Sequence, residues 1–273
     1  MMAAKITKRA VCVGINDYPG TFNDLSGCVN DANDWAELLR DEFAFGENVT
    51  LLTDADATKS NILSALGGLI TGAQGGDVVV FTYSGHGTWV YDRGERDESD
   101  NRDEALCAHD GIILDDELRN VIRQIDQDAY LTVISDSCHS GSVTRAMLKR
   151  AYEKDKEAAE NAPKPRYMPP DDEIDALRTE MIPIRRRAFY PESGMPEILL
   201  SGCNATEYSY DAYISGRYNG AMTAMAISLI KSEPKRTYRE FHEKLRRLLP
   251  TPRYPQSPQL EGSDGNKDRV LFG

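Results

Sequence analysis

Short runs of apolar, strand-forming residues that stop abruptly at small or polar residues are the feature that most restricts the fold of this chain. The two clearest runs are residues 77–83 and 131–134. Elsewhere apolar residues recur at helical spacing, as at about 30–43 and after Thr58. This alternation predicts an α/β fold of three layers, with a mostly parallel central sheet of six or more strands.

Both runs lead into residues that can carry chemistry. The first is followed by His86, which has a glycine on each side, and the second by Cys138. Because the carboxyl ends of neighbouring parallel strands meet at one edge of a sheet, we expect His86 to face Cys138. A cysteine reacts as its thiolate, and a nearby histidine can hold the proton and pass it to a leaving amine. The backbone amides of Gly87 and Cys138 are candidates for an oxyanion hole.

Each of these residues also has a simpler interpretation. Cysteine is among the most buried residue types, so Cys138 taken alone is typical of core packing. Cys138, His139 and His86 together could instead bind a soft metal, although they match no recognised ligand spacing. A zinc analysis of the purified protein would decide between a metal site and a reactive thiol.

Together the two motifs are much more specific. Ser-Gly-His-Gly at 84–87, followed by Asp-Ser-Cys-His-Ser-Gly at 136–141, resembles the caspase-like cysteine peptidases, and most closely their metacaspase branch. Residues 25–32 and 256–259 resemble the terminal sequence blocks of the same family. The resemblance implies a caspase-like fold, a monomer, and a thiol acyl-enzyme mechanism in which His86 and Cys138 are the catalytic dyad and no cofactor is required.

The resemblance also implies a specificity. In metacaspases, acids that match Asp31 and Asp136 line the primary substrate pocket, with Ser84 beside them. Two carboxylates in a partly desolvated pocket would bind arginine or lysine and reject aspartate. We therefore expect cleavage after arginine or lysine in polypeptide substrates with basic residues. Stabilisation of a helix end is the alternative for Asp31, and Cys28 is expected to serve only packing.

Calcium is a further implication of the resemblance. Many metacaspases bind calcium through acids, and Asp115 and Asp116 match one pair of these ligands, with Asp100 and Asp103 as further candidate ligands. Carboxylate oxygens are the ligands that calcium prefers. However, Arg145 stands where another acid is expected. The alternative is equally typical of these acids: Asp115 and Asp116 would stabilise the dipole at the start of a helix, and Asp100 and Asp103 would belong to a solvated acidic loop before it.

The chain length fits a single domain, 1–273, that carries a polar insertion at about 145–196. A compact domain rarely needs so long a connection, so we expect the insertion to regulate or recognise, with an idle surface excursion as the alternative. Residues 143–166 are predicted to form a polar helix, and residues 270–272 an edge strand. Basic residues of the insertion are candidates for self-cleavage: Arg145, Lys149, Arg150, Arg185, Arg186 and Arg187.

Charge and cysteine content restrict the partners and the compartment. The net charge of -12, from 44 acidic and 32 basic residues, argues against nucleic acid, whose phosphates would be repelled. The five cysteines are widely spread and form no CxxC pair, which favours a reducing compartment over a disulfide framework. We find no apolar signal core and no membrane-length apolar run, and we expect a cytoplasmic protein without a membrane partner.

The main alternative to a peptidase is a catalytically silent or latent caspase-like domain that acts as a binding scaffold. The presence of His86, Cys138, Asp31 and Asp136 together argues against it. Turnover of matched peptides would distinguish the two functions.

Overall fold

The computed structural model describes residues 6–18, 24–91, 102–138, 162–168 and 192–273. A six-stranded sheet with the strand order β12-β9-β7-β3-β1-β2 forms its centre. Every neighbouring pair in this sheet is parallel except β12 with β9, so the predicted mostly parallel sheet is confirmed. The strands are β1 (Lys8–Gly14), β2 (Val49–Thr53), β3 (Val78–Ser84), β7 (Tyr130–Asp136), β9 (Glu197–Ser201) and β12 (Gln259–Glu261).

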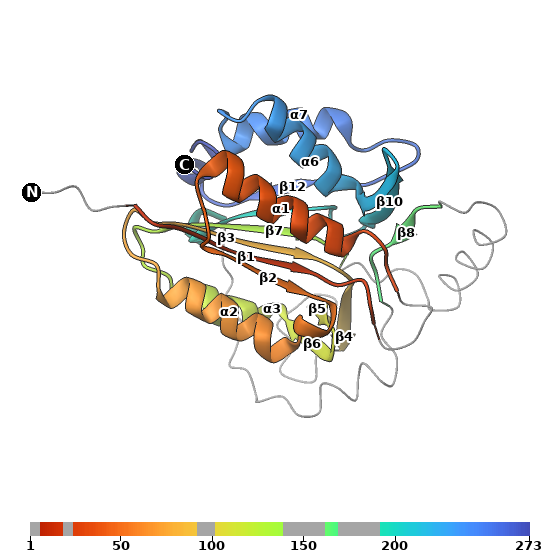
Figure 1. Cartoon of the computed structure of the whole chain (residues 1–273), viewed down its shortest axis with the longest axis horizontal. Coiled ribbons are helices and arrows are strands. Elements are labelled where there is room, and N and C mark those ends of the chain that lie inside the picture. The colour runs from red at the N-terminus through yellow and green to blue at the C-terminus, as the bar shows by residue number, and fades with distance from the viewer. Residues whose placement is uncertain (1–5, 19–23, 92–101, 139–161, 169–191) are drawn as a thin grey trace, which may run out of the picture.

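Helices cover both faces of the sheet, which gives the three layers (Figure 1). On one face lie α1 (Cys28–Phe43), α6 (Ala221–Ser232) and α7 (Tyr238–Leu248), and on the other lie α2 (Lys59–Thr71) and α3 (Asp115–Ile122). A shorter helix, α8 (Asp264–Lys267), and two 3-10 turns, η2 (Asp54–Asp56) and η3 (Glu192–Gly194), complete the described helical elements.

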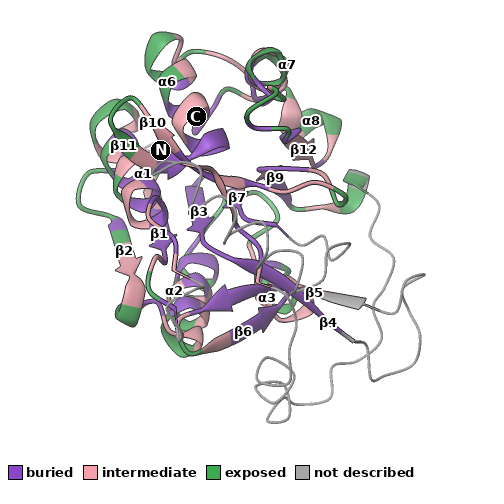
Figure 2. Ribbon diagram, turned by 90° about the vertical axis from the view of Figure 1, so that its right-hand side faces the viewer, coloured by how far each residue is buried: buried purple, intermediate pink, exposed green. Residues whose placement is uncertain are grey.

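Each face of the sheet packs against its own core. Along β1, Ala10 and Cys12 belong to the core that contains Trp35 of α1, whereas Val11 belongs to the core that contains Ile62 of α2. Successive side chains of a strand point to opposite faces, so one apolar strand supplies both cores. Figure 2 shows the central strands as buried and the outward surfaces of the helices as exposed.

Two small antiparallel sheets, which the sequence did not predict, flank the carboxyl edge of the central sheet. One begins directly after His86 and the other includes a strand from the insertion, β8, which pairs with β10. The first sheet is β4 (Gly87–Tyr91), β5 (Arg102–Ala108) and β6 (Gly111–Leu114), and the second is β8 (Lys164–Pro165), β10 (Tyr210–Ile214) and β11 (Arg217–Gly220).

Two sequence-based predictions are wrong. Residues 162–166 are not helical, because Pro163 and Pro165 lack the amide hydrogen a helix interior requires, and β8 occupies this stretch instead. At the other end of the chain, Val270 makes only an isolated bridge to Thr237, while Leu271 and Phe272 are buried in the core. The edge strand of the central sheet is β12.

The register of β3 and β7 positions the residues of interest. These strands are parallel neighbours, and Ser84 is paired with Asp136. His86 and Cys138 each follow two residues beyond that pair, so both lie at the same edge of the sheet, as predicted. Among the described helices, none has the length and apolar character needed to cross a membrane.

Candidate active site

The loops that carry His86 and Cys138 meet through their main chains. A Cβ atom on Gly87 would overlap the carbonyl group of Cys138, so this contact requires a glycine. The amides of Gly87 and Cys138 donate to one acceptor, the carbonyl oxygen of Arg166, at N···O distances of 3.1 and 3.2 Å. Two amides that converge on one carbonyl oxygen form the arrangement by which oxyanion holes bind a reacting carbonyl.

His86 is held in a buried loop by two tyrosines. Its main-chain amide donates to the Tyr18 hydroxyl at 2.9 Å, and its carbonyl accepts from the Tyr83 hydroxyl at 2.7 Å. Its ring packs against the Tyr18 ring with a centroid separation of 4.8 Å. The histidine is 4% exposed. Hydrogen bonds to its amide and to its carbonyl therefore fix the main chain of His86.

Cys138 is fully buried at the end of the strand β7. Its Sγ accepts a hydrogen bond from the amide of Ser209 at 2.6 Å. The carbonyl of the same Ser209 accepts from the amide of Arg166 at 2.9 Å. The sulfur atom and the Arg166 main chain are thus held side by side by one residue.

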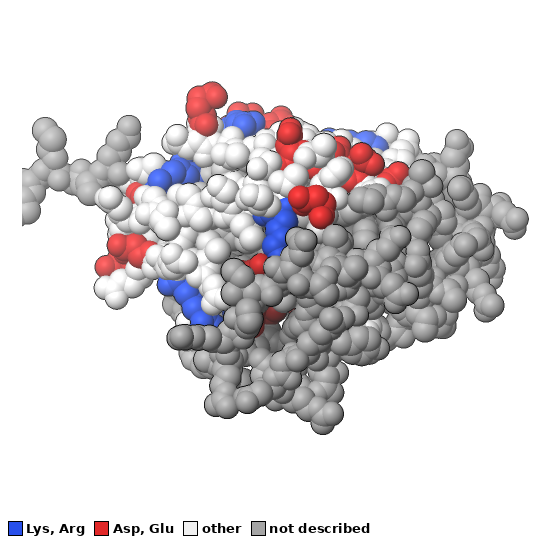
Figure 3. Space-filling model, turned by 90° about the horizontal axis from the view of Figure 1, so that it is seen from below, with Lys and Arg blue, Asp and Glu red and all other residues white. Residues whose placement is uncertain are grey.

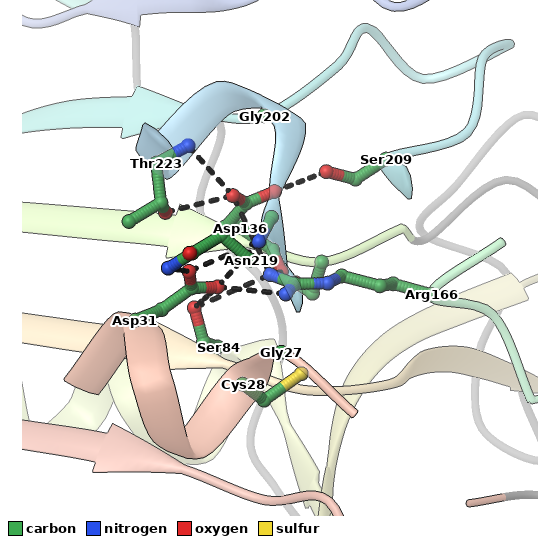
Figure 4. A network of polar contacts seen from close by, with 12 residues as sticks. Gly27, Cys28, Asp31, Ser84, Asp136, Arg166, Gly202, Ser209, Asn219 and Thr223 are labelled. Carbon is green, nitrogen blue, oxygen red and sulfur yellow. Dashed lines mark hydrogen bonds and ion pairs between the residues drawn. The ribbon is translucent and has the colours of Figure 1, made fainter. Parts of the chain in front are cut away.

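The guanidinium of Arg166 lies within a cluster of three buried acids, Asp31, Asp136 and Asp211, which we call the acidic cluster. Figure 4 shows Asp31 and Asp136 beside the arginine. Its nitrogen atoms are 2.7 Å from Asp31 Oδ2, 3.4 Å from Asp136 Oδ2 and 3.1 Å from Asp211 Oδ1. All four side chains are at most 1% exposed. Sequence analysis named Asp31 and Asp136 but missed Asp211 and Arg166.

Ser84 links Asp31 of the acidic cluster to Arg166. Its hydroxyl donates to Asp31 Oδ2 at 2.9 Å and accepts from Arg166 Nη1 at 3.3 Å. The side-chain hydrogen bonds of Asp31 all go to other segments of the chain, and its own helix makes no side-chain cap. Asp31 thus contributes to the acidic cluster while it lies in the first turn of α1, the position that its alternative, stabilisation of a helix end, requires.

Each acid of the cluster has hydrogen-bond donors besides Arg166. Because these donors belong to the fixed framework, the carboxylates keep their orientation independently of the arginine. The donors are the Asn219 side chain and Gly220 amide to Asp31, the Ser209 hydroxyl and Thr223 amide and hydroxyl to Asp136, and the Ser26 and Gly27 amides to Asp211.

Burial has the largest effect on Asp31. It raises the pKa of Asp31 to about 6, with a further contribution from Asp136, although Arg166 acts in the opposite direction. Burial alone would lower the pKa of Arg166, but the three carboxylates raise it above its usual value. The arginine is therefore charged, and the cluster around it favours a cation.

Residues 164–168 run through the site as an extended segment. Besides the Arg166 contacts, the amide of Met168 donates to the Gly87 carbonyl at 2.9 Å, and Tyr167 forms a parallel bridge with Gly87. On the other side of Arg166, β8 pairs with β10. This is how a polypeptide that adds a strand to an exposed sheet edge is bound.

The residues that sequence analysis missed come from the stretch 208–223 and from the insertion. Asp211 carried a usable signal, because it is an acid within a tyrosine-rich stretch that follows a buried strand to the same sheet edge. Arg166 carried a weaker one: two nearby prolines favour an extended backbone, but nothing distinguishes it from the other basic residues of the insertion. The basic residues proposed for self-cleavage all lie outside the described residues.

The predicted metal ligands are only partly described. Asp115 and Asp116 open α3, and Asp115 pairs with Arg119 at 3.1 Å. Burial, together with Asp116, raises the pKa of Asp115 to about 7 despite the opposing effect of Arg119. Asp100 and the side chain of Asp103 lie outside the described residues, as does His139 of the soft-metal alternative. Within the described part of the chain no three potential metal ligands come together.

The face shown in Figure 3 carries charged side chains of both signs. On its described portion, the lysines and arginines are scattered among acidic and uncharged residues. This distribution agrees with the acidic balance of the whole sequence.

Comparisons with known proteins identify related chains. A family model described as "Metacaspase, peptidase C14 domain" matches residues 8–147. Metacaspase-1 of Cryptococcus neoformans is 30% identical over 97% of this chain and 64% of its own length, and metacaspase-1A of Aspergillus fumigatus is 31% identical over 97% and 71%. The chain thus spans slightly less than two thirds of the first of these relatives.

Among solved structures, a crystal structure of a Geobacter sulfurreducens protein is similar over 97% of this chain and 98% of that one. The two share 26% sequence identity and superpose with a TM-score of 0.73. This similarity extends over the central sheet and the helices on both of its faces.

Proposed function

The chain belongs to the metacaspase family, and from that premise we propose that it is a cysteine endopeptidase that hydrolyses peptide bonds after arginine or lysine. His86 and Cys138 form its catalytic dyad in this proposal. The amides of Gly87 and Cys138 form the oxyanion hole, and the acidic cluster with Ser84 binds the basic side chain.

One observation supports the proposal: the carbonyl oxygen and the guanidinium of Arg166 lie where the proposal puts the reacting carbonyl and the basic side chain of a substrate. Its carbonyl oxygen accepts from the Gly87 and Cys138 amides, and its guanidinium is surrounded by three buried carboxylates. One residue of the chain itself therefore supplies both a carbonyl oxygen to the two amides and a basic side chain to the three carboxylates.

In this proposal the reaction has two stages, acylation of Cys138 and hydrolysis of the acyl-enzyme. The Cys138 sulfur forms a bond to the carbonyl carbon, and its proton passes to His86, while the oxygen that becomes negative is held by the two amides. The C–N bond then breaks, and His86 gives the proton to the departing amine. Water adds to the resulting thioester, releases the new carboxyl end and restores the thiol of Cys138.

Arginine should be favoured over lysine. The two terminal nitrogens of Arg166 contact different partners, with Nη2 near Asp31 and Asp211 and Nη1 near Ser84 and Asp136. A lysine ammonium is a single point charge and cannot reach all of these groups from one position.

Self-processing is part of the same proposal, and the bond between Arg166 and Tyr167 is its site. While the side chain of Arg166 holds the segment 164–168 in the substrate site, the chain is a latent enzyme, and either cleavage of this bond or loss of that side chain frees the site. Cleavage at Arg145, Lys149, Arg150 or Arg185 to Arg187 stays a prediction, because these residues lie outside the described part of the chain.

We further propose that calcium, when present, binds at Asp115 and Asp116, with Asp100 and Asp103 as additional ligands. Carboxylate oxygens fit this ion, and the raised pKa of Asp115 marks a position where a cation would stabilise the ionised form. Calcium would act there as a structural ion. A calcium-dependent rise in the melting temperature of the Cys138→Ala protein, absent in an Asp116→Asn derivative, would support it; no rise would favour the helix-start role.

The remaining parts of the proposal concern organisation and partners. We propose one domain over residues 1–273 with an insertion at about 145–196, a monomer, a cytoplasmic location, and basic polypeptide segments as partners in place of nucleic acid or membrane. The chemistry itself requires no cofactor.

Peptides matched except for arginine, lysine or aspartate before the cleaved bond test the function. The Arg166→Ala protein is the enzyme of choice, since its acidic cluster is left open to added peptides, and a Cys138→Ala derivative is its control. We expect arginine peptides to be cut fastest and aspartate peptides not at all, with no turnover in the control. Absence of turnover with every peptide would favour a binding scaffold instead.

A further inference from the structure

We infer that the residue after the cleaved bond is selected by an aromatic subsite built from Trp89 and Tyr208, with Cys203 beside them. The inference rests on the proposed function and adds a second specificity to it. The occupant in the structure is Tyr167, which packs with Trp89, Cys138 and Cys203 in a buried cluster against which Tyr208 also packs.

The backbone ties this subsite to the reacting groups. Trp89 follows Gly87 by two residues on β4, so the two residues face the same side of the strand. Gly87 is the residue whose amide donates to the Arg166 carbonyl. Tyr208 directly precedes Ser209, whose amide donates to the Cys138 sulfur. A side chain that follows the cleaved bond is therefore brought to both aromatic rings by the same main-chain contacts that align the bond.

The contacts of Tyr167 are those of a recognised side chain. It is 4% exposed, and its ring centroid is 5.8 Å from that of Tyr208, with the ring planes tilted by 51°. Tilted rings at this separation attract one another beyond the burial of apolar area. The sulfur of Cys203 adds a polarizable partner of the kind that aromatic rings favour.

These contacts define the chemical class that the subsite selects. A planar aromatic side chain, tyrosine or phenylalanine, fills the space between Trp89 and Tyr208. A small side chain such as alanine would leave these surfaces without a partner. An aspartate would place a charge among buried apolar groups and within reach of an already acidic region, which is unfavourable.

The competing explanation is that Tyr167 only anchors the uncut segment in the full chain. In that case a short peptide, which has no segment to anchor, would show no preference at this position. Internally quenched peptides of the series Lys-Pro-Arg-X-Met, with X as tyrosine, phenylalanine, alanine or aspartate, separate the two explanations. The enzyme is the full chain with Arg166→Ala and Tyr167→Ala, so that its own segment fills neither the acidic cluster nor the aromatic subsite, and the measured quantity is the ratio of kcat/KM values between peptides.

We expect tyrosine and phenylalanine peptides to exceed the alanine peptide by about tenfold in kcat/KM, with the aspartate peptide slowest. Equal values across the series would overturn the inference and leave the proposed function standing, because cleavage after arginine would still occur. If no peptide of the series were cut, the proposed function would fail, and the inference with it.

Enzyme variants locate the preference. Tyr208→Ala is expected to reduce the ratio of tyrosine to alanine turnover toward one, and Tyr208→Phe to keep it, because the ring and not the hydroxyl makes the contact. Tyr213→Ala is the matched control: this tyrosine lies on the neighbouring strand β10 and packs against Tyr218. An unchanged ratio in Tyr208→Ala would show that the subsite lies elsewhere. The ratio is independent of any general loss of folded enzyme.

Discussion

Arg166 Nη2 donates to Asp31 Oδ2 at 2.7 Å, and neither side chain is exposed to solvent. The pair joins the first turn of α1 to a segment of the insertion 135 residues away along the chain. Removal of one partner from a buried ion pair leaves the other charge buried and unpaired, which is costly in free energy. Substitutions in this pair, and replacement of Arg166 by the arginine of a bound peptide, should therefore have measurable effects.

The acid that sequence analysis missed provides a direct test of the acidic cluster. In an Arg166→Ala background, Asp211→Asn should lower kcat/KM for arginine peptides by about 30-fold or more, since truncating a partner of a buried charge pair costs about 2–5 kcal/mol. Asp41→Asn is the matched control, because Asp41 lies exposed near the end of α1. Equal effects of the two substitutions would contradict a role for Asp211 in binding.

Gly220 forms a wall of the same cluster. A Cβ atom there would overlap both the Asp136 carboxylate and the Arg166 guanidinium, while the backbone angles of φ -63° and ψ 135° suit alanine. Gly220→Ala should therefore act through bulk and raise KM for arginine peptides by about tenfold or more, on the scale of other methylene-sized pocket effects. Gly67→Ala on α2, where a Cβ would meet open space, controls for the substitution itself. An unaltered KM for Gly220→Ala would place the bound side chain elsewhere.

The pKa of Asp31 makes a prediction about stability. Its folded value of about 6 lies above the value of 3.8 for a free aspartate, so the stability that Asp31 contributes is present below about pH 4 and is lost as the pH rises through 6. Relative to Asp31→Asn, the protein with Asp31 should lose up to about 3 kcal/mol of unfolding free energy between pH 4 and pH 7. Urea titrations of both proteins, each carrying Cys138→Ala to prevent self-cleavage, measure this difference. If the unfolding free energy of the protein with Asp31 rose with pH relative to that of Asp31→Asn, the prediction would be contradicted.

Removal of the Arg166 side chain should abolish latency. We expect the unsubstituted chain to cut added arginine peptides after an initial lag, while its own segment leaves the site, and Arg166→Ala to cut them without this lag. Arg247→Ala, at an exposed position of α7, should keep the lag. Identical progress curves for all three proteins would mean that residues 164–168 do not block access.

How far the sequence could predict this arrangement depended on how local each signal was. The runs that became β3 and β7 ended in chemistry-bearing residues, and the parallel-sheet rule was enough to bring His86 and Cys138 to one edge. Asp31 and Asp136 lay in short motifs whose resemblance to a family suggested their partnership. These are signals within a few residues of the feature they predict.

The rest depended on contacts between distant segments. Asp211 and Gly220 reach the cluster because β10 and β11 form a hairpin beside it, and this hairpin gives no clean alternation of apolar and polar residues. Arg166 is one of many basic residues, and its selection depends on the pairing of β8 with β10 and on two amides from other strands. No pattern within the insertion encodes these partners.

The central claim is that Arg166 occupies the site as a substrate arginine, and the amino-terminal sequence of the fragment released on self-cleavage tests it most directly. The purified chain is incubated, its fragments are separated, and the carboxyl-terminal one is sequenced, with Cys138→Ala and Arg166→Ala proteins treated in parallel. We predict a fragment that begins at Tyr167, absent from both variants. Absence of a fragment that begins at Tyr167, or the same fragment from Cys138→Ala, would contradict the account.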